Sequence, residues 1–296
     1  LAPRVIMATT NIMKATWPIF YDLHDKNLTI YAQYTAAPWE YIGTQGVIQG
    51  TFETLSSIGR LHFDDSLAGR ILLTAGMGGM GGNQTRAMSM LGGVCICADV
   101  DRTVIDRRLE VGYCDVVVTD FDEAVKLAQE AAADKRPLGI ALVGNAVDVF
   151  QSAWDSGFLP DILTDMTPAH DPIAYIPVGM DVAEAAALRK SDRDKYFKIS
   201  GASMIRHLTL MNDFMDKGVQ VFEYGNSLRK EARDAGMPED IAMKIPGFVA
   251  AYIRPLFCEG RGPFRWTCLS REAEDLRKID DMILEEFADD ELVNRW

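Results

Sequence analysis

The chain has 296 residues, a net charge of −13 at pH 7 and a pI near 4.8. With 48% hydrophobic and 25% charged residues, it has the composition of a globular protein of one large or two ordinary domains. The acidic balance, without a basic cluster, argues against nucleic-acid binding, and no apolar run reaches the roughly 18 residues of a membrane span.

The five cysteines are an odd number, and they form neither a Cys-x-x-Cys pair nor a metal-binding spacing with the four histidines. We therefore expect no metal site and buried, reduced thiols, as in a cytoplasmic protein. Cys95 and Cys97 lie two residues apart on a predicted strand, so they should share one of its faces.

The first part of the chain, residues 1–45, becomes rich in aromatic and amide side chains from Tyr31 onward. These alternate with small residues, which is typical of a loop that lines a site. A well-packed turn would explain the same composition equally well. Residues 47–60 can then form a helix that leads into the next domain.

Residues 70–101 carry the most informative pattern of the chain. Arg70 to Thr74 is an apolar run that predicts a buried parallel strand. A glycine-rich turn at 76–82, a segment at 84–91 that can be helical, and a second apolar run ending at Asp99 follow in that order. This is the order of strand, turn, helix, strand and acid in the dinucleotide-binding fingerprint.

Gly76, Gly78 and Gly81 have the spacing G-x-G-x-x-G. The first glycine allows the tight turn, the second lets backbone N–H groups approach a pyrophosphate, and the third lets helix and strand pack closely. The helix N-terminus favours the diphosphate, and Asp99 can accept both ribose hydroxyls while disfavouring a 2′-phosphate, so NAD is predicted over NADP. The alternative is a turn that only packs a helix on a sheet, which does not need five glycines in seven positions.

Strands and helices continue to alternate after Asp99. The predicted strands are 115–120, 138–143, 161–164 and 219–223, and the predicted helices are 102–111, 121–133, 147–156 and 180–216. This alternation predicts a parallel, right-handed α/β sheet. Ligands in such sheets bind beyond the strand carboxyl ends, where Asp99, Asn145 and residues 165–171 all fall.

Near its end the chain changes character. Residues 246–266 are rich in Gly, Pro and aromatic side chains, which marks a domain change, and residues 271–296 predict an acidic amphipathic helix or helix pair. The predicted fold class is α/β, a Rossmann-like NAD-binding domain set within a second core domain that is only partly present. The predicted divisions are 1–45 (core domain), 46–248 (Rossmann-like domain) and 249–296 (start of a C-terminal core segment).

Several stretches together resemble the urocanate hydratase (urocanase) family: 33–51, 74–82, 144–146, 164–177, 222–229 and 246–266. The resemblance runs from end to end of the chain, and the stretches occur in the family's order. Urocanases are much longer, with a segment before the equivalent of Leu1 and a large segment after the equivalent of Trp296. The chain is therefore similar to the middle of such an enzyme, and a family active-site cysteine would lie downstream of it.

The resemblance implies a hydro-lyase that adds water to urocanate, an imidazole-acrylate, to give 4-imidazolone-5-propionate in histidine degradation. It implies tightly bound NAD+ that accepts no hydride. The nicotinamide C4 acts as an electrophile and bonds to the imidazole ring, so that water can add. The resemblance also implies a cytoplasmic homodimer.

The residues that match the family's NAD contacts are Gln33, Gly79, Met80, Gly81, Asn145, Ala146, Thr167, Ala169, His170, Tyr175 and Tyr224. The fingerprint adds Gly76, Gly78 and Asp99, and the loop after the fifth strand adds Met166, Pro168 and Ile176. Asp99 stands where the family usually has Glu, and the ribose role survives that change.

Two residues are predicted to be catalytic. His170 lies in an Ala-His-Asp-Pro turn, which by itself suggests a structural hydrogen bond, and the family match favours a role in the site. Arg265 matches a family active-site arginine, whose guanidinium can bind the substrate carboxylate through two parallel N–H donors. A surface ion pair is the alternative for Arg265.

Other positions depart from the family pattern. Val104 replaces a cofactor-contacting Arg, with Arg102 close by, Met166 replaces a Gln, and Pro168 replaces a Ser. The loop 170–177 is also one residue shorter. These changes keep open a sister hydratase that acts on a modified urocanate, such as a sulfur-substituted one, because Met166 would favour a softer substituent.

Two other classes of protein also remain open. One is an ordinary NAD-dependent dehydrogenase, although no His–Asp or Tyr–Lys dyad has a clear dehydrogenase pattern. The other is a non-catalytic protein that binds NAD.

Overall fold

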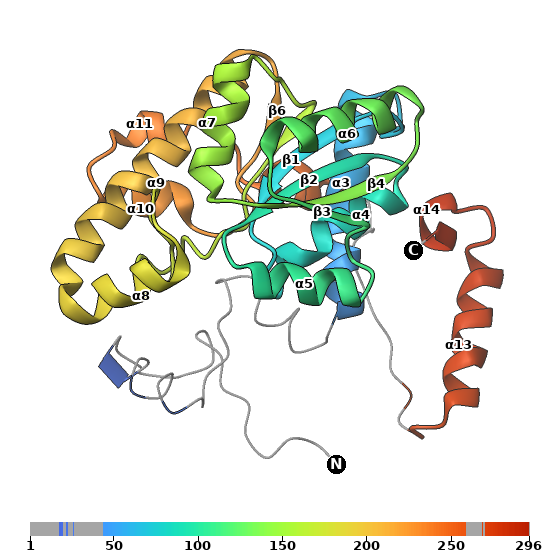
Figure 1. Cartoon of the computed structure of the whole chain (residues 1–296). Coiled ribbons are helices and arrows are strands. Elements are labelled where there is room, and N and C mark those ends of the chain that lie inside the picture. The colour runs from blue at the N-terminus through green and yellow to red at the C-terminus, as the bar shows by residue number, and fades with distance from the viewer. Residues whose placement is uncertain are drawn as a thin grey trace.

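The computed structural model describes residues 18–19, 22, 26, 44–258, 268 and 270–295. A six-stranded sheet lies at the centre of the main body (Figure 1). Its strands are β1 (Ile71–Ala75), β2 (Val94–Asp99), β3 (Val116–Val118), β4 (Leu138–Val143), β5 (Ile162–Leu163) and β6 (Gln220–Val221). Every pairing in this sheet is parallel, which confirms the predicted α/β, Rossmann-like fold class.

The strand order is β3-β4-β2-β1-β5-β6. The chain first extends the sheet to one side of β1 and then crosses to the other side with β5 and β6. Such a change of direction leaves a crevice beyond the strand carboxyl ends, where α/β proteins bind ligands. The sequence did not predict that β4 lies between β2 and β3, because all three are short apolar runs that suit several positions.

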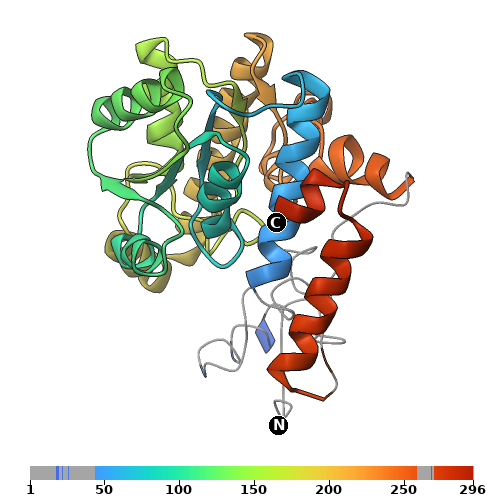
Figure 2. The same cartoon turned by 90° about the vertical axis from the view of Figure 1, so that its right-hand side faces the viewer.

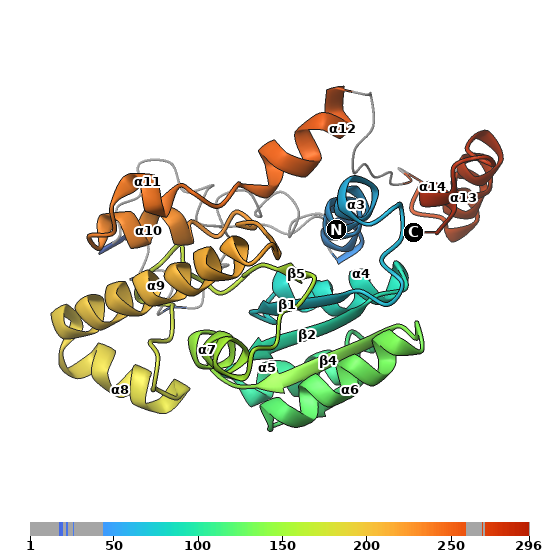
Figure 3. The same cartoon turned by 90° about the horizontal axis from the view of Figure 1, so that it is seen from above.

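Helices cover both faces of the sheet, and the bounds of those in the main body are α3 (Thr44–His62), η1 (Gly81–Asn83), α4 (Gln84–Met90), α5 (Arg102–Glu110), α6 (Phe121–Ala133), α7 (Ala146–Ser156), α8 (Val182–Ser191), α9 (Arg193–Asp216), α10 (Leu228–Asp234), α11 (Glu239–Ala242), η2 (Val249–Ile253) and α12 (Arg254–Cys258). Seen from above, α3 and α4 lie on one face, and α6 and α7 lie on the other (Figure 3). This three-layer arrangement buries the strands on both sides.

The core divides at the sheet because successive strand side chains point to opposite faces. Leu72 and Cys95 pack with α3 and α4, whereas Leu73 and Ile96 pack with α6 and α7, and all four are fully buried. Burying each of these leucine side chains stabilises the fold by roughly 2 kcal/mol. The two hydrophobic clusters hold the strand ends, and therefore the loops that follow them, in fixed positions.

The cysteines agree with the sequence in part. Cys95 and Cys97 share a face as predicted, Cys114 is buried in the same cluster, and burial raises the pKa of all three thiols, for Cys114 to about 11. The expectation of a buried thiol is wrong for Cys258, which is exposed. It is the last residue of the short helix α12, where the core no longer covers it.

The single helical region expected at 180–216 is two helices, α8 and α9. They meet at Asp192, whose backbone φ is −153° and whose carboxylate accepts a hydrogen bond from the N–H of Lys195. An aspartate in this position caps a new helix and ends the previous one. The sequence pattern missed the break because the apolar and charged residues continue with the same period on both sides.

The segment after residue 248 packs against α3. Ser57 Oγ donates a hydrogen bond of 3.3 Å to the carbonyl of Tyr252, and the Tyr252 ring lies edge-on to Phe222. The predicted division of the chain at 45 and 248 stays a prediction.

The acidic end of the chain, predicted as one helix or a helix pair, is a pair, α13 (Ala273–Glu286) and α14 (Glu291–Arg295), on the side of the molecule that carries α3 (Figure 2). None of the residues of α13 is buried. Within the described ranges, no helix has the length and apolar character needed to cross a bilayer.

Candidate functional site

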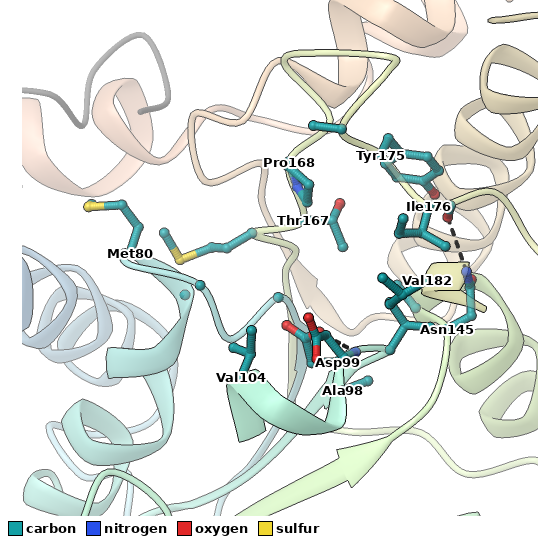
Figure 4. A pocket seen from close by; sticks show the side chains of 18 of the residues that line it. Met80, Ala98, Asp99, Val104, Asn145, Thr167, Pro168, Tyr175, Ile176 and Val182 are labelled. Carbon is teal, nitrogen blue, oxygen red and sulfur yellow. Dashed lines mark hydrogen bonds between the residues drawn. The ribbon is translucent and has the colours of Figure 1, made fainter. Parts of the chain in front are cut away.

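A cavity of about 440 Å³ opens beyond the carboxyl ends of β1, β2, β4 and β5, where the strand order changes direction. Its volume is in the range of small-molecule sites. In Figure 4, Met80, Asp99, Asn145, Thr167 and Tyr175 surround this space from different elements.

Most of the predicted cofactor residues line the cavity: Gly76, Gly78, Gly79, Met80, Gly81, Asp99, Asn145, Ala146, Met166, Thr167, Pro168, His170, Tyr175 and Ile176. Ala169 does not line it, because its side chain is fully buried. Tyr224 does not line it either, because its ring stacks on Phe248 at 4.5 Å between centroids. The predicted residues Gln33 and Arg265 lie outside the described residues.

The glycine loop, residues 76–82, forms one wall, and its shape follows from backbone sterics. Gly76 has a φ of +87°, and a Cβ there would lie 2.5 Å from the carbonyl of Met166. A Cβ on Gly81 would lie 1.8 Å from the carbonyl oxygen of Gly76. The structure therefore accounts for the first glycine by the turn and for the third by close packing.

Gly78 is different, because the fold itself does not require a glycine there. A Cβ on Gly78 would meet no atom within 4 Å, and the residue lines the cavity. Its backbone is therefore uncrowded on the side where a side chain would stand. In dinucleotide-binding loops, a glycine at the second position lets the backbone approach a pyrophosphate.

Asp99 stands at the end of β2 and faces the same cavity. Its Oδ2 accepts the N–H of Met77 at 2.6 Å, and its Oδ1 accepts the N–H of Asp101 at 2.9 Å. Burial raises the pKa of this carboxyl, and the two backbone donors oppose that rise. A carboxylate has about four acceptor sites, so Asp99 can hold the glycine loop and still accept ribose hydroxyls.

The β5 loop, residues 165–177, forms the opposite wall, and buried side chains hold it. Asp165, 1% exposed, accepts hydrogen bonds from the N–H and the hydroxyl of Thr167, at 2.9 and 2.7 Å. Asn226 donates both to Asp165 and to the carbonyl of Thr167. The residues that face the cavity are thus fixed from behind.

His207 on α9 extends this buried network. Its Nδ1 lies 3.1 Å from the hydroxyl of Tyr175, and its Nε2 lies 3.9 Å from Oδ1 of Asp165. Burial lowers the pKa of His207 and raises that of Tyr175, so both groups are neutral near neutral pH. No sequence motif pointed to this histidine, which lies in the long helix α9.

The end of the β5 loop is tied to two helices. Asn145 caps α7 by accepting the N–H of Val147, and its amide donates to the carbonyls of Ile176 and Pro177, each at 3.1 Å. From α9, the hydroxyl of Tyr196 donates to the carbonyl of Tyr175 at 2.8 Å. These bonds place the loop over the strand ends.

His170 lines the cavity from the β5 loop and is 6% exposed. Burial lowers the pKa of its imidazole, and the carboxylate of Asp171 partly opposes that change. A neutral imidazole at this place can accept or relay a proton.

The rest of the lining is mainly apolar and includes Val104 and Val182. Arg102 is not among the lining residues; it is exposed and forms an ion pair of 2.7 Å with Asp106. Arg189 lines the cavity and donates to the carbonyl of Ile173 at 2.9 Å. In the part of the chain that the structure describes, no group of three His, Cys, Asp or Glu side chains is placed to hold a metal ion.

Comparison with protein families gives two matches that together span most of the chain. Residues 43–252 match the model of the urocanase Rossmann-like domain. Residues 255–296 match the model of the urocanase C-terminal domain.

Proposed function

The chain belongs to the urocanase family, and we propose that it is a hydratase that binds NAD+ in this cavity and adds water to urocanate or a close analogue. The observation that carries the cofactor assignment is Gly78, a glycine that the fold does not require and whose missing side chain leaves room at the cavity. When bound, NAD+ would supply an electron-accepting nicotinamide ring that makes the substrate open to water.

The chain's own residues would divide the work of binding. The backbone N–H groups of the glycine loop would face the diphosphate, and Asp99 would accept the ribose hydroxyls. A 2′-phosphate would lie against the carboxylates of Asp99 and Asp101, so we expect NADP+ to bind at least about tenfold more weakly than NAD+. Tyr175 and Ile176 would form the wall opposite the glycine loop.

We propose two residues for the chemistry. His170, buried and neutral at the cavity, would move a proton during the addition of water. Arg265, a proposal from family membership alone, would bind the substrate carboxylate. Family membership also supports a cytoplasmic homodimer, and a monomer by light scattering at micromolar concentration would contradict the dimer.

The test of the cofactor assignment is Gly78→Val. The Cβ would meet no atom within 4 Å in the folded ligand-free protein, so the melting temperature should stay close to that of the wild type. NAD+ affinity, measured by calorimetry, should fall by about a hundredfold or more, since the side chain would overlap the diphosphate. Gly59→Ala, which adds a Cβ in α3 next to the flexible side chain of Leu67, is the control. Unchanged affinity in Gly78→Val would refute the diphosphate assignment.

A modified urocanate is the second candidate substrate, because Met166, Pro168 and Val104 all line the cavity. They present sulfur and carbon where the family has polar side chains, which favours a softer, less polar substituent. The ratio of the kcat/KM values for urocanate and a sulfur-substituted urocanate decides which of these two compounds is the preferred substrate. Loss of substrate absorbance without NADH absorbance would separate either hydratase from a dehydrogenase.

A further inference from the structure

Arg108 on α5 reaches the glycine loop from outside the cavity. Its Nε donates to the carbonyl of Met77 at 2.9 Å, and its Nη2 donates to the carbonyl of Gly78 at 2.8 Å. The guanidinium also lies 5.6 Å from the centre of the Tyr113 ring. Arg108 is not among the residues that line the cavity, so its contact with the site runs through the loop backbone.

These two hydrogen bonds, together with one of 3.0 Å from the N–H of Gly82 to the carbonyl of Gly78, set the direction of two N–H groups. In a trans peptide the C=O and the N–H point to opposite sides. The carbonyls of Met77 and Gly78 face Arg108, so the N–H groups of Gly78 and Gly79 face away from it, and both residues line the cavity. The N–H of Met77 is held separately, by Asp99 at 2.6 Å.

Gly82 gives an independent sign that the loop is built around this arginine. A Cβ on Gly82 would lie 2.3 Å from Nε and 2.8 Å from Cδ of Arg108, and 2.9 Å from the Met77 carbonyl oxygen to which that Nε donates. Gly82 lies outside the G-x-G-x-x-G spacing, so the fingerprint does not explain it. Its absent side chain leaves the path by which Arg108 reaches the loop.

We propose that Arg108 is a positioning residue for the nucleotide diphosphate: it turns two loop carbonyls outward and so turns the N–H groups of Gly78 and Gly79 toward the ligand. This inference rests on the proposed binding of NAD+. It differs from a direct charge effect, because Arg108 acts by orienting neutral donors that are already in the loop.

The experiment compares NAD+ affinity and the melting temperature of the ligand-free full chain for Arg108→Met, Arg108→Lys and Arg107→Met. Arg107 is the exposed neighbour on the same helix, so its replacement removes the same charge without the two hydrogen bonds. Arg108→Met should weaken NAD+ binding by about tenfold or more. The NAD+ affinity of Arg108→Lys should lie between those of Arg108→Met and the wild type, because an ammonium group lacks the planar fork that reaches two carbonyls. Arg107→Met should bind NAD+ as tightly as the wild type does.

Salt separates orientation from charge, because high ionic strength screens a field effect. The loss of NAD+ affinity in Arg108→Met should persist in 0.5 M NaCl, where the Debye length is below about 5 Å. Wild-type affinity in both Arg108 variants would overturn the inference, as would an equal loss in Arg107→Met that salt abolishes. If the wild-type chain itself binds no NAD+, the proposed cofactor fails, and this inference fails with it.

Gly82→Ala gives a second line of evidence that does not depend on the stability of Arg108→Met alone. The added Cβ would displace the guanidinium, so the single variant should lose affinity as Arg108→Lys does or more. In an Arg108→Ala background, Gly82→Ala should cost less, since the Cδ and Nε atoms are gone and only the Met77 carbonyl oxygen, at 2.9 Å, still meets the new Cβ. Fully additive losses would contradict a shared action through Arg108.

Discussion

The two walls of the cavity are held by different kinds of interaction. The glycine loop is set by backbone sterics, where a Cβ on Gly81 would lie 1.8 Å from the Gly76 carbonyl oxygen. The β5 loop is set by buried side chains from distant parts of the chain: Asn226 lies 61 residues after Asp165, and His207 lies 32 residues after Tyr175. The turn of the first wall is therefore set mainly within the loop, with Asp99 and Arg108 holding its backbone groups, whereas the second wall depends throughout on side chains from distant parts of the chain.

This difference decides how each wall responds to change. A wall made by sterics fails abruptly when an atom is added, because backbone atoms cannot move aside cheaply. A wall made by buried hydrogen bonds weakens by steps as single partners are lost, and it responds to pH because one partner is a histidine. Three variants test this contrast, from the largest expected effect to the smallest.

Gly81→Ala should have the largest effect, because it breaks the steric wall. The new Cβ cannot share space with the Gly76 carbonyl, so the free energy of unfolding should fall by about 3 kcal/mol or more. Urea denaturation measures the loss. Gly78→Ala in the same loop is the matched control and should leave the unfolding midpoint unchanged, since its Cβ meets nothing within 4 Å. Equal losses in the two variants would mean that sterics do not set this wall.

His207→Gln tests the second wall through pH. Burial lowers the pKa of His207, so below about pH 6.5 the unfolded chain binds a proton that the folded chain does not. Stability should therefore fall as the pH drops below that value and be fully present above it. Each such group changes the free energy of unfolding by up to about 1.4 kcal/mol per pH unit. His207→Gln should remove one such group and so flatten the dependence of stability on pH.

The measurement is urea denaturation at several values between pH 5 and pH 8, roughly the window around the unfolded histidine. His62→Gln, which removes an exposed imidazole on α3, controls for the loss of a histidine. An unchanged slope in His207→Gln would show that this histidine does not stay neutral in the folded chain. His170, whose pKa burial also lowers, would supply the slope that remains.

The contrast also explains what the sequence predicted. The parallel sheet and the glycine loop follow from short-range patterns, since apolar runs and glycine spacings act on their own neighbours. The helix break at Asp192 and the position of β4 between β2 and β3 could not be predicted in this way, because neighbouring segments there have similar sequence patterns. His207 and Arg108 carried no local signal, because each gains its role only when a distant loop comes within hydrogen-bonding distance.

Tyr224→Phe should have the smallest effect, and it tests where the site ends. The sequence resemblance predicts that Tyr224 contacts NAD+, whereas the structure places it beside the cavity rather than on it. Its hydroxyl donates to Oγ1 of Thr51 at 3.0 Å, and its ring stacks on Phe248. Removing one buried hydrogen bond between neutral groups typically costs about 1 kcal/mol.

If that hydrogen bond is the main role of Tyr224, the phenylalanine variant loses about 1 kcal/mol of unfolding free energy, while its NAD+ affinity changes by less than about threefold. Tyr175→Phe is the matched comparison, because Tyr175 lines the cavity and its hydroxyl meets His207 at 3.1 Å. There the affinity should fall along with the stability, since the ring loses the contact that holds it against the cavity. A Tyr224→Phe variant that loses more than tenfold in affinity with little change in stability would instead place its hydroxyl on the cofactor, and the second wall would then extend past the β5 loop to β6.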